Sequence, residues 1–309
     1  MAYYRLSQVI RMRREAMEHS RFEYDVEGPS FMTVFRLEKG EVRVKENTYR
    51  SLSRAMGEEE STRQGVLKTN DIRVLWLMNE ISNSFLKRDY ATVEALIGQL
   101  EEQLDCTVKR NQQYLEFVKA KLQYNQGMIS AEDYEIVIRN GISYGELNFD
   151  GMVAKKWPFH EQEWQMLIGI VESIRKGKDY EQQKHLLEQL KSDLEFGYME
   201  SEYSAVYTTY VRWRISDALG NMGYHREAIA IDEENRCFCE ERAEFRYLAE
   251  IYYDIFWNYN MLKKKETLSE HEEDRCKECL LKAYYINKSW YPSKELYEVR
   301  VREYYPNEI

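Results

Sequence analysis

The feature that most constrains this chain is a pattern of helix, turn and helix that recurs along it. The clearest copies are FLKRDYATVEALIGQLEEQL (85–104), IRKGKDYEQQKHLLEQLKSDL (174–194) and LGNMGYHREAIAIDEEN (219–235), with a looser copy at 122–138. In each, a short turn is followed by a segment with apolar residues at i, i+3, i+4 and i+7, which is typical of an amphipathic helix. The turns lie near residues 88, 127, 177 and 223. One such helix pair cannot bury its apolar face alone, so the pairs are expected to stack.

The composition favours helices over the whole chain. Only 4 Pro and 14 Gly occur among 309 residues, and 43% of the residues are hydrophobic, which suits helices around a buried core. No secretory leader and no uninterrupted apolar run of about 18 residues occurs. We therefore predict an all-α cytoplasmic protein that does not enter a membrane.

The first 57 residues differ from the rest in charge. They hold 11 Lys/Arg and 8 Asp/Glu, a net charge of +3, whereas residues 58–309 hold 33 and 46, a net charge of −13. A basic surface is required of a protein that binds the DNA polyanion. The charge separation therefore favours, weakly, a nucleic-acid partner for this N-terminal segment, which we call the head.

Apolar spacing predicts short helices in the head over 6–17, 21–27, 31–39 and 46–57. Ser20 and Ser30 are suited to begin the second and third helices, and Gly40 to end the third. A short helix, a Gly-containing turn and a Ser-capped helix form the arrangement with which a helix-turn-helix presents its second helix to the major groove of DNA. On spacing alone, a small helical bundle without that role remains an alternative.

The residues of the head resemble the Xre/Cro-type helix-turn-helix family. Its members commonly carry I-R-x-x-R in the first helix, matched by Ile10, Arg11 and Arg14. They carry E-G-x-S-x-x-T-L-x-R-I-E-x-G across the turn and the recognition helix. The matching residues here are Glu27, Gly28, Ser30, Thr33, Val34, Arg36, Leu37, Glu38 and Gly40.

The resemblance implies an N-terminal helix-turn-helix domain, residues 1–57, whose helix 30–38 enters a groove of double-stranded DNA. The implied DNA-binding residues are Arg21, Ser30, Phe31, Met32, Thr33, Phe35, Arg36, Lys39, Arg43 and Lys45. The chain departs from the family at Phe31, Met32 and Phe35, where polar side chains are usual. Apolar groups contact a thymine methyl group but do not read hydrogen-bond donors and acceptors. Either the protein reads a T-rich or deformable site, or the head contacts protein and binds DNA poorly.

Residues 58–70 are polar and predict a linker, and 71–309 predict a helical repeat domain. The turns in this domain resemble those of tetratricopeptide repeats; a generic α-bundle is the alternative. The resemblance implies an α-solenoid of helix pairs whose first helices line a ligand-binding face suited to an extended peptide. The implied ligand-binding positions are Tyr114, Lys121, Asn125, Gln165, Glu172, Arg175, Tyr210, Asp217 and Asn221.

The cysteines and histidines do not form a recognisable site. Cys237 and Cys239, like Cys276 and Cys279, fall in sequence of helical character, whereas structural zinc pairs normally lie on turns. With Cys106 they make an odd number of cysteines, which favours reduced thiols. No phosphate-binding, dinucleotide-binding or nucleophile motif occurs. We therefore expect no metal, no cofactor and no enzymatic activity.

A basic helix-turn-helix head joined to an acidic repeat domain resembles the Rgg- and PlcR-type peptide-responsive regulators of Gram-positive bacteria. That resemblance implies a cytoplasmic homodimer, a short quorum-sensing peptide bound by the repeats, and altered engagement of promoter DNA. A ligand shifts such an equilibrium only if it binds the two states unequally. The main alternative is a repeat scaffold for protein–protein interaction with a vestigial head. A repeat-borne phosphatase, resembling the Rap proteins, would need a polar constellation that is not found.

Overall fold

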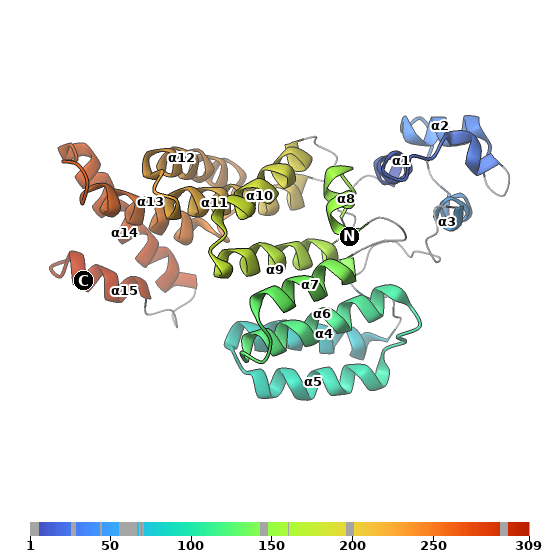
Figure 1. Ribbon diagram of the computed structural model, residues 1–309, viewed down its shortest axis with the longest axis horizontal. Coiled ribbons are helices and arrows are strands. Elements are labelled where there is room, and N and C mark those ends of the chain that lie inside the picture. The colour runs from blue at the N-terminus through green and yellow to red at the C-terminus, as the bar shows by residue number, and fades with distance from the viewer. Residues whose placement is uncertain are drawn as a thin grey trace. The chain divides into compact units, whose positions relative to one another are not determined.

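The computed structural model describes residues 6–25, 29–43, 45–55, 67, 69, 71–142, 148–159, 161–195, 201–290 and 296–308. These ranges are helical and contain no β-strand (Figure 1), which confirms the predicted all-α class. Contacts divide the chain into two compact units, Met1–Lys178 and Asp179–Ile309. The predicted linker 58–70 lies almost wholly outside the described ranges, so the domain limits at residues 57 and 70 stay a prediction. No helix within these ranges qualifies as a membrane span.

The head contains helices α1 (Leu6–Ala16), α2 (Phe31–Glu38) and α3 (Glu46–Ala55), as predicted. The predicted helix over 21–27 is instead a short 3-10 helix, η1 (Arg21–Asp25), and residues 26–28 are not described. Ser30 begins α2 as expected, because its side-chain oxygen accepts a hydrogen bond from the backbone N–H of Thr33 at 3.4 Å. Gly40 follows α2 with φ of 71°, a backbone conformation that glycine adopts without strain.

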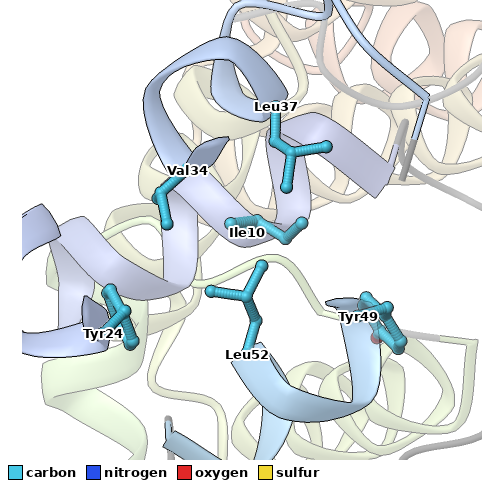
Figure 2. Packing of buried hydrophobic residues seen from close by; sticks show 6 residues of the cluster. All are labelled: Ile10, Tyr24, Val34, Leu37, Tyr49 and Leu52. Carbon is cyan, nitrogen blue, oxygen red and sulfur yellow. The ribbon is translucent and has the colours of Figure 1, made fainter. Parts of the chain in front are cut away.

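One apolar cluster holds the head together (Figure 2). Ile10 of α1 lies between Leu37 of α2 and Leu52 of α3, and the remaining members are Tyr24, Val34 and Tyr49. Ile10, Val34, Leu37 and Leu52 are each at most 2% exposed. Full burial of such a side chain stabilises a fold by about 1.5–3 kcal/mol. The cluster therefore fixes the orientation of α2 relative to α1 and α3.

The first unit continues with helices α4 to α9: α4 (Ile72–Lys87), α5 (Tyr90–Gln103), α6 (Lys109–Asn125), α7 (Ala131–Ile142), α8 (Phe149–Ala154) and α9 (Glu161–Gly177). Neighbours in sequence pack together: α4 with α5, α5 with α6, α6 with α7, and α7 with α9 (Figure 1). The head contacts the segment after α8, since the Arg13 guanidinium lies 5.4 Å from the ring centre of buried Trp157. Lys155 Nζ also lies 2.7 Å from a carboxylate oxygen of Glu18.

The second unit contains helices α10 to α15: α10 (Tyr180–Glu195), α11 (Ser201–Asn221), α12 (His225–Arg242), α13 (Leu248–Leu262), α14 (Glu270–Trp290) and α15 (Leu296–Tyr304). Each packs on the next, and α11 also contacts α13. The pair α13–α14 is a further helix pair that the sequence pattern did not reveal. Ser269 and Glu272 form a reciprocal cap at the start of α14, because each side chain accepts a hydrogen bond from the backbone N–H of the other.

All four predicted turns separate two helices, at 88, 127, 177 and 223. Each contains a residue in the left-handed region: Arg88 (φ 58°), Gly127 (φ 74°), Lys178 (φ 63°) and Gly223 (φ 90°). A left-handed residue ends an α-helix by redirecting the chain while its N–H still bonds to the last turn. The helices on either side of three of these turns pack together, as α4–α5, α6–α7 and α11–α12, which agrees with the tetratricopeptide-like interpretation. The boundary between the two units falls in the turn at Lys178.

Candidate functional site

A buried ion pair supports helix α2 on its inner side. The Glu38 side chain is 2% exposed and accepts hydrogen bonds from Arg14 Nε and, at 3.2 Å, from Arg14 Nη2. Arg21 Nε donates to the same carboxylate at 2.7 Å, and Arg14 Nη1 donates to the backbone oxygen of His19 at 3.0 Å. Arg14 and Glu38 are both matched positions of the helix-turn-helix motif. The ion pairs of Glu38 with Arg14 and Arg21 therefore hold α1, η1 and α2 together as one rigid element.

The outer side of α2 carries a row of aromatic rings. Phe22 of η1 stacks on Phe31, with ring centres 4.4 Å apart and planes 13° apart, and Phe31 lies 6.3 Å from Phe35. Phe22 is 65% exposed and the adjacent Met32 is 51% exposed. We call Phe22, Phe31, Met32 and Phe35 the apolar face. Phe22 was not identified from the sequence. The signal that could have revealed it is the position of an aromatic residue directly after Arg21, at the start of the segment that packs against α2.

Two cations lie against the Phe35 ring of this apolar face. Lys39 Nζ lies 4.4 Å from the ring centre of Phe35, and the Arg21 guanidinium lies 5.5 Å from it. The predicted contacts Arg36, Lys39, Arg43 and Lys45 are all exposed. Arg21 is half-buried and bonded to Glu38, so it supports α2, and its predicted contact with DNA stays a prediction.

The two predicted hydroxyl contacts, Ser30 and Thr33, bond to each other through their side-chain oxygens at 3.0 Å. They lie in the first turn of α2, where Ser30 is exposed and Thr33 half-buried. A helix N-terminus carries unpaired N–H groups and a partial positive charge, which suits a phosphate group.

The ligand-binding positions predicted in the first unit lie on α6 and α9. On α6, Tyr114 is 5% exposed. Burial lowers the pKa of Lys121, whose ammonium lies 4.8 Å from the ring centre of Phe85. Asn125 Nδ2 donates to the Lys121 backbone oxygen at 2.7 Å.

On α9, Gln165 is exposed, and Arg175 Nε donates to the Glu172 carboxylate at 3.2 Å. Glu172 and Arg175 are thus engaged with each other, as Asn125 is with the backbone of α6, whereas no hydrogen-bond partner is described for the Tyr114 hydroxyl group or for Gln165. Their assignment to a ligand stays a prediction.

The predicted positions of the second unit lie on α11. Tyr210 is 4% exposed, and its ring centre lies 5.5 Å from that of Tyr247, the residue immediately before α13. Asp217 is half-buried, and its carboxylate accepts a hydrogen bond from Asn221 Nδ2 at 3.1 Å. Asn221 itself is exposed. Of the predicted ligand-binding residues, Asn125, Gln165 and Asn221 present their side chains most openly.

Sequence reasoning missed the residues that join α11 to α13. Trp213 Nε1 donates to the Asp254 carboxylate at 2.7 Å, and the Trp213 ring stacks on Tyr247 with centres 5.4 Å apart. The Arg214 guanidinium lies 3.7 Å from the ring centre of Trp213. Burial, with the nearby charge of Asp217, raises the pKa of Asp254 to about 7. Trp213 follows Tyr210 by three residues, so helical spacing was the available signal.

The described cysteines are all free. Cys106 and Cys237 are exposed, whereas Cys239, Cys276 and Cys279 are buried. Burial raises the pKa of the Cys279 thiol to about 12, which disfavours the reactive thiolate. Within the described ranges, no group of three or more His, Cys, Asp or Glu side chains is arranged to hold a metal ion.

Taken together, the fold is that of a helix-turn-helix head followed by tetratricopeptide-like helix pairs. Solved structures share this fold over nearly the whole chain. PlcR from Bacillus thuringiensis, in complex with the peptide PapR7 and DNA, matches with a TM-score of 0.57 at 14% identity, covering 94% of this chain and 98% of that one.

Apo PlcR matches with a TM-score of 0.59 at 12% identity, over 96% and 99% of the two chains. ComR from S. thermophilus, in complex with DNA and its signalling peptide ComS, matches with a TM-score of 0.50 at 13% identity, over 97% and 98%. No protein-family model and no curated protein sequence matches the chain.

Proposed function

We propose that this chain is a sequence-specific DNA-binding transcriptional regulator whose helical repeats sense a short peptide. The observation that carries the proposal is the geometry of α2. Its inner side is fixed by the apolar cluster and by Glu38, while its outer side presents Phe31, Met32 and Arg36 beside exposed cations. A rigid helix with an exposed face and a basic margin is what entry into a major groove requires.

The shared fold supports the proposal. PlcR and ComR, which have this head and these repeats, were each solved with a peptide and DNA. We infer the same two partners for this chain, and we assign its helical repeats to residues 71–309. Catalysis and a cofactor are not part of the proposed function, because the fold neighbours are regulators.

We infer that the protein acts as a cytoplasmic homodimer. Two copies of α2 related by a two-fold axis would read paired half-sites about 34–36 Å apart, or a multiple of that distance. A peptide that binds one arrangement of the two copies more tightly than another would then change the affinity for DNA.

The second candidate function is a scaffold for protein–protein interaction with a head that no longer binds DNA. It would be favoured if Phe31, Met32 and Phe35 packed against the repeats. The ring contacts described for Phe31 and Phe35 instead come from Phe22, Arg21 and Lys39, which are residues of the head itself. This arrangement, beside a basic margin, favours the regulator.

The test is selection of bound fragments from a random duplex pool by the purified full-length protein, with affinity followed against salt concentration. We expect a recovered motif, a steep loss of affinity with salt, and loss of the motif in Arg36→Ala. Arg73→Ala is the matched control, since Arg73 is an exposed arginine on α4 outside the head. Salt-independent binding, or no motif with and without cell extract as a source of peptide, would favour the scaffold.

A further inference from the structure

The apolar face of the head specifies a class of DNA sequence. On α2, Phe31 and Phe35 are one turn apart, as are Met32 and Arg36. The exposed Met32 and Arg36 lie opposite the buried Val34 and Leu37, and the half-buried Phe31 and Phe35 lie at the edge between the two sides. Phe31 and Met32 lie in the first turn of the helix, the part of a recognition helix that reaches base edges. Their side chains carry no strong hydrogen-bond donor or acceptor.

The chemistry of these side chains restricts what they can read. In the major groove, guanine, adenine and cytosine are distinguished by hydrogen-bonding groups, whereas thymine alone adds a C5-methyl group. A phenyl ring or a thioether gains nothing from an amino or carbonyl edge and desolvates it at a cost. Contact with a thymine methyl group buries apolar surface on both sides and is favourable.

The stacking of the rings makes the apolar face continuous and stiff. Phe22, which belongs to η1, is held against Phe31 at 4.4 Å, and Phe31 is followed by Phe35 at 6.3 Å. The nearly parallel planes, 13° and 18° apart, extend the face beyond a single base pair. A face of this kind suits methyl groups on successive base pairs better than one isolated thymine.

The charge around the apolar face favours DNA over an apolar protein surface. Arg36, Lys39, Arg43 and Lys45 are exposed, while Glu41 is the one exposed carboxylate described between residues 36 and 45. Cations at the margin of an apolar protein contact would lose hydration without gaining partners, whereas phosphate groups provide partners for them.

We propose, on the basis of the proposed function, that the apolar face reads a run of adjacent thymines through their methyl groups. Arg36, one turn beyond Met32 on the same side of α2, is the side chain that reads a guanine next to this run. The DNA half-site is therefore a thymine tract that adjoins a guanine, and its specificity depends on methyl contacts.

The experiment replaces thymine by deoxyuridine, which removes only the methyl group and keeps the base pair. A duplex recovered from the random pool is resynthesised with single replacements along each half-site, and its affinity for the full-length protein is measured. Burial of one methyl group is worth about a fourfold change in affinity, so we expect about a fourfold loss at each contacted thymine. Replacements outside the half-sites are expected to have no effect.

Two matched variants connect the methyl effect to the apolar face. Met32→Gln is expected to abolish the difference between thymine and deoxyuridine at one position of the tract while leaving the others. Met128→Gln is the control, because Met128 is also exposed, at 68%, but lies in the turn between α6 and α7. Both positions are on the surface, so both variants should fold.

The outcomes separate this inference from the proposed function. A recovered motif without adjacent thymines, or one whose affinity is unchanged by deoxyuridine, would overturn the methyl readout and leave the regulator intact. If no motif is recovered from the pool, the proposed function and the methyl readout fall together, and a protein partner for the apolar face becomes the explanation.

Discussion

Replacing Glu38 by Gln should strongly destabilise the head, although the change is nearly isosteric. The Glu38 carboxylate is 2% exposed and accepts hydrogen bonds from both Arg14 and Arg21. Gln is neutral and turns an N–H₂ group towards one of the guanidinium groups. The Arg14 side chain is only 10% exposed, so its charge would remain largely buried with only the longer contact from Nη2 to the Glu15 carboxylate, at 3.4 Å. Removing one partner of such a pair costs about 3–5 kcal/mol.

That cost is comparable with the whole stability of a domain of this size. At about 0.05–0.15 kcal/mol per residue, the predicted head would be stable by about 3–8 kcal/mol. A loss of 3 kcal/mol would speed exchange of the protected amide protons of α1 and α2 by more than about 100-fold. We would measure exchange by mass spectrometry in the full-length chain, together with affinity for the selected duplex, which should fall in parallel.

The control is Glu18→Gln, because Glu18 also lies in the head and accepts from Lys155 Nζ at 2.7 Å on the surface, where 76% of the Glu18 side chain is exposed. Solvent screens an exposed pair of this kind, so exchange should hardly change. If Glu38→Gln were as mild as this control, the charge argument would be refuted. The double variant Arg14→Met with Glu38→Leu removes the buried charge and should be more stable than Glu38→Gln alone.

Two further predictions concern the repeats. The pKa of the Asp254 carboxyl group is about 7 in the folded chain and near 4 in the unfolded chain, so the folded state binds the proton more tightly. The stabilisation that this proton provides is complete at acid pH and is lost as the pH rises through 7. The free energy of unfolding, measured with denaturant, should therefore rise by on the order of 1–2 kcal/mol when the pH is lowered from about 8 to about 5.5. The rise should be smaller in Asp254→Asn, and an equal rise in the two proteins would contradict the argument. Gly220→Ala should destabilise by about 1–3 kcal/mol, because its Cβ would lie 2.6 Å from the Asn258 side-chain oxygen. Gly98→Ala should stabilise the fold by about 0.5–1 kcal/mol, because Gly98 lies within α5 and its Cβ would point into open space. Thermal unfolding of both glycine variants tests the contrast, and equal shifts of the unfolding temperature would refute it.

The turns of the repeats could be predicted because their signals are local. The segment Lys-Gly-Lys-Asp-Tyr at 176–180 combines residues that end one helix with an Asp that is suited to begin the next, and a helix does begin at Tyr180. The turn between α13 and α14, residues 263–269, lacks both glycine and an Asp-Tyr step, so it escaped the comparison of repeats. Its Ser269-to-Glu272 capping pattern was the signal that would have revealed it.

Contacts between distant residues could not be predicted in the same way. The motif identified both Arg14 and Glu38, but their spacing of 24 residues carries no information about a hydrogen bond. Arg21 was expected at the DNA backbone from its position at the start of the second helix of the motif, and no local pattern showed that its side chain also bonds to the buried Glu38 carboxylate. The link from Trp213 to Asp254 across α11 and α13 likewise depends on packing that no local pattern specifies.

The left-handed residues in the turns bear on how such chains diverge. Two of the four, Arg88 and Lys178, are not glycine, and a left-handed backbone costs such residues roughly 1–2 kcal/mol. Because the turn depends on backbone handedness and tolerates this cost, different residue types can replace one another there by single mutations. The helix faces can then drift independently, and a shared fold can persist after sequence similarity has fallen below what sequence comparison detects.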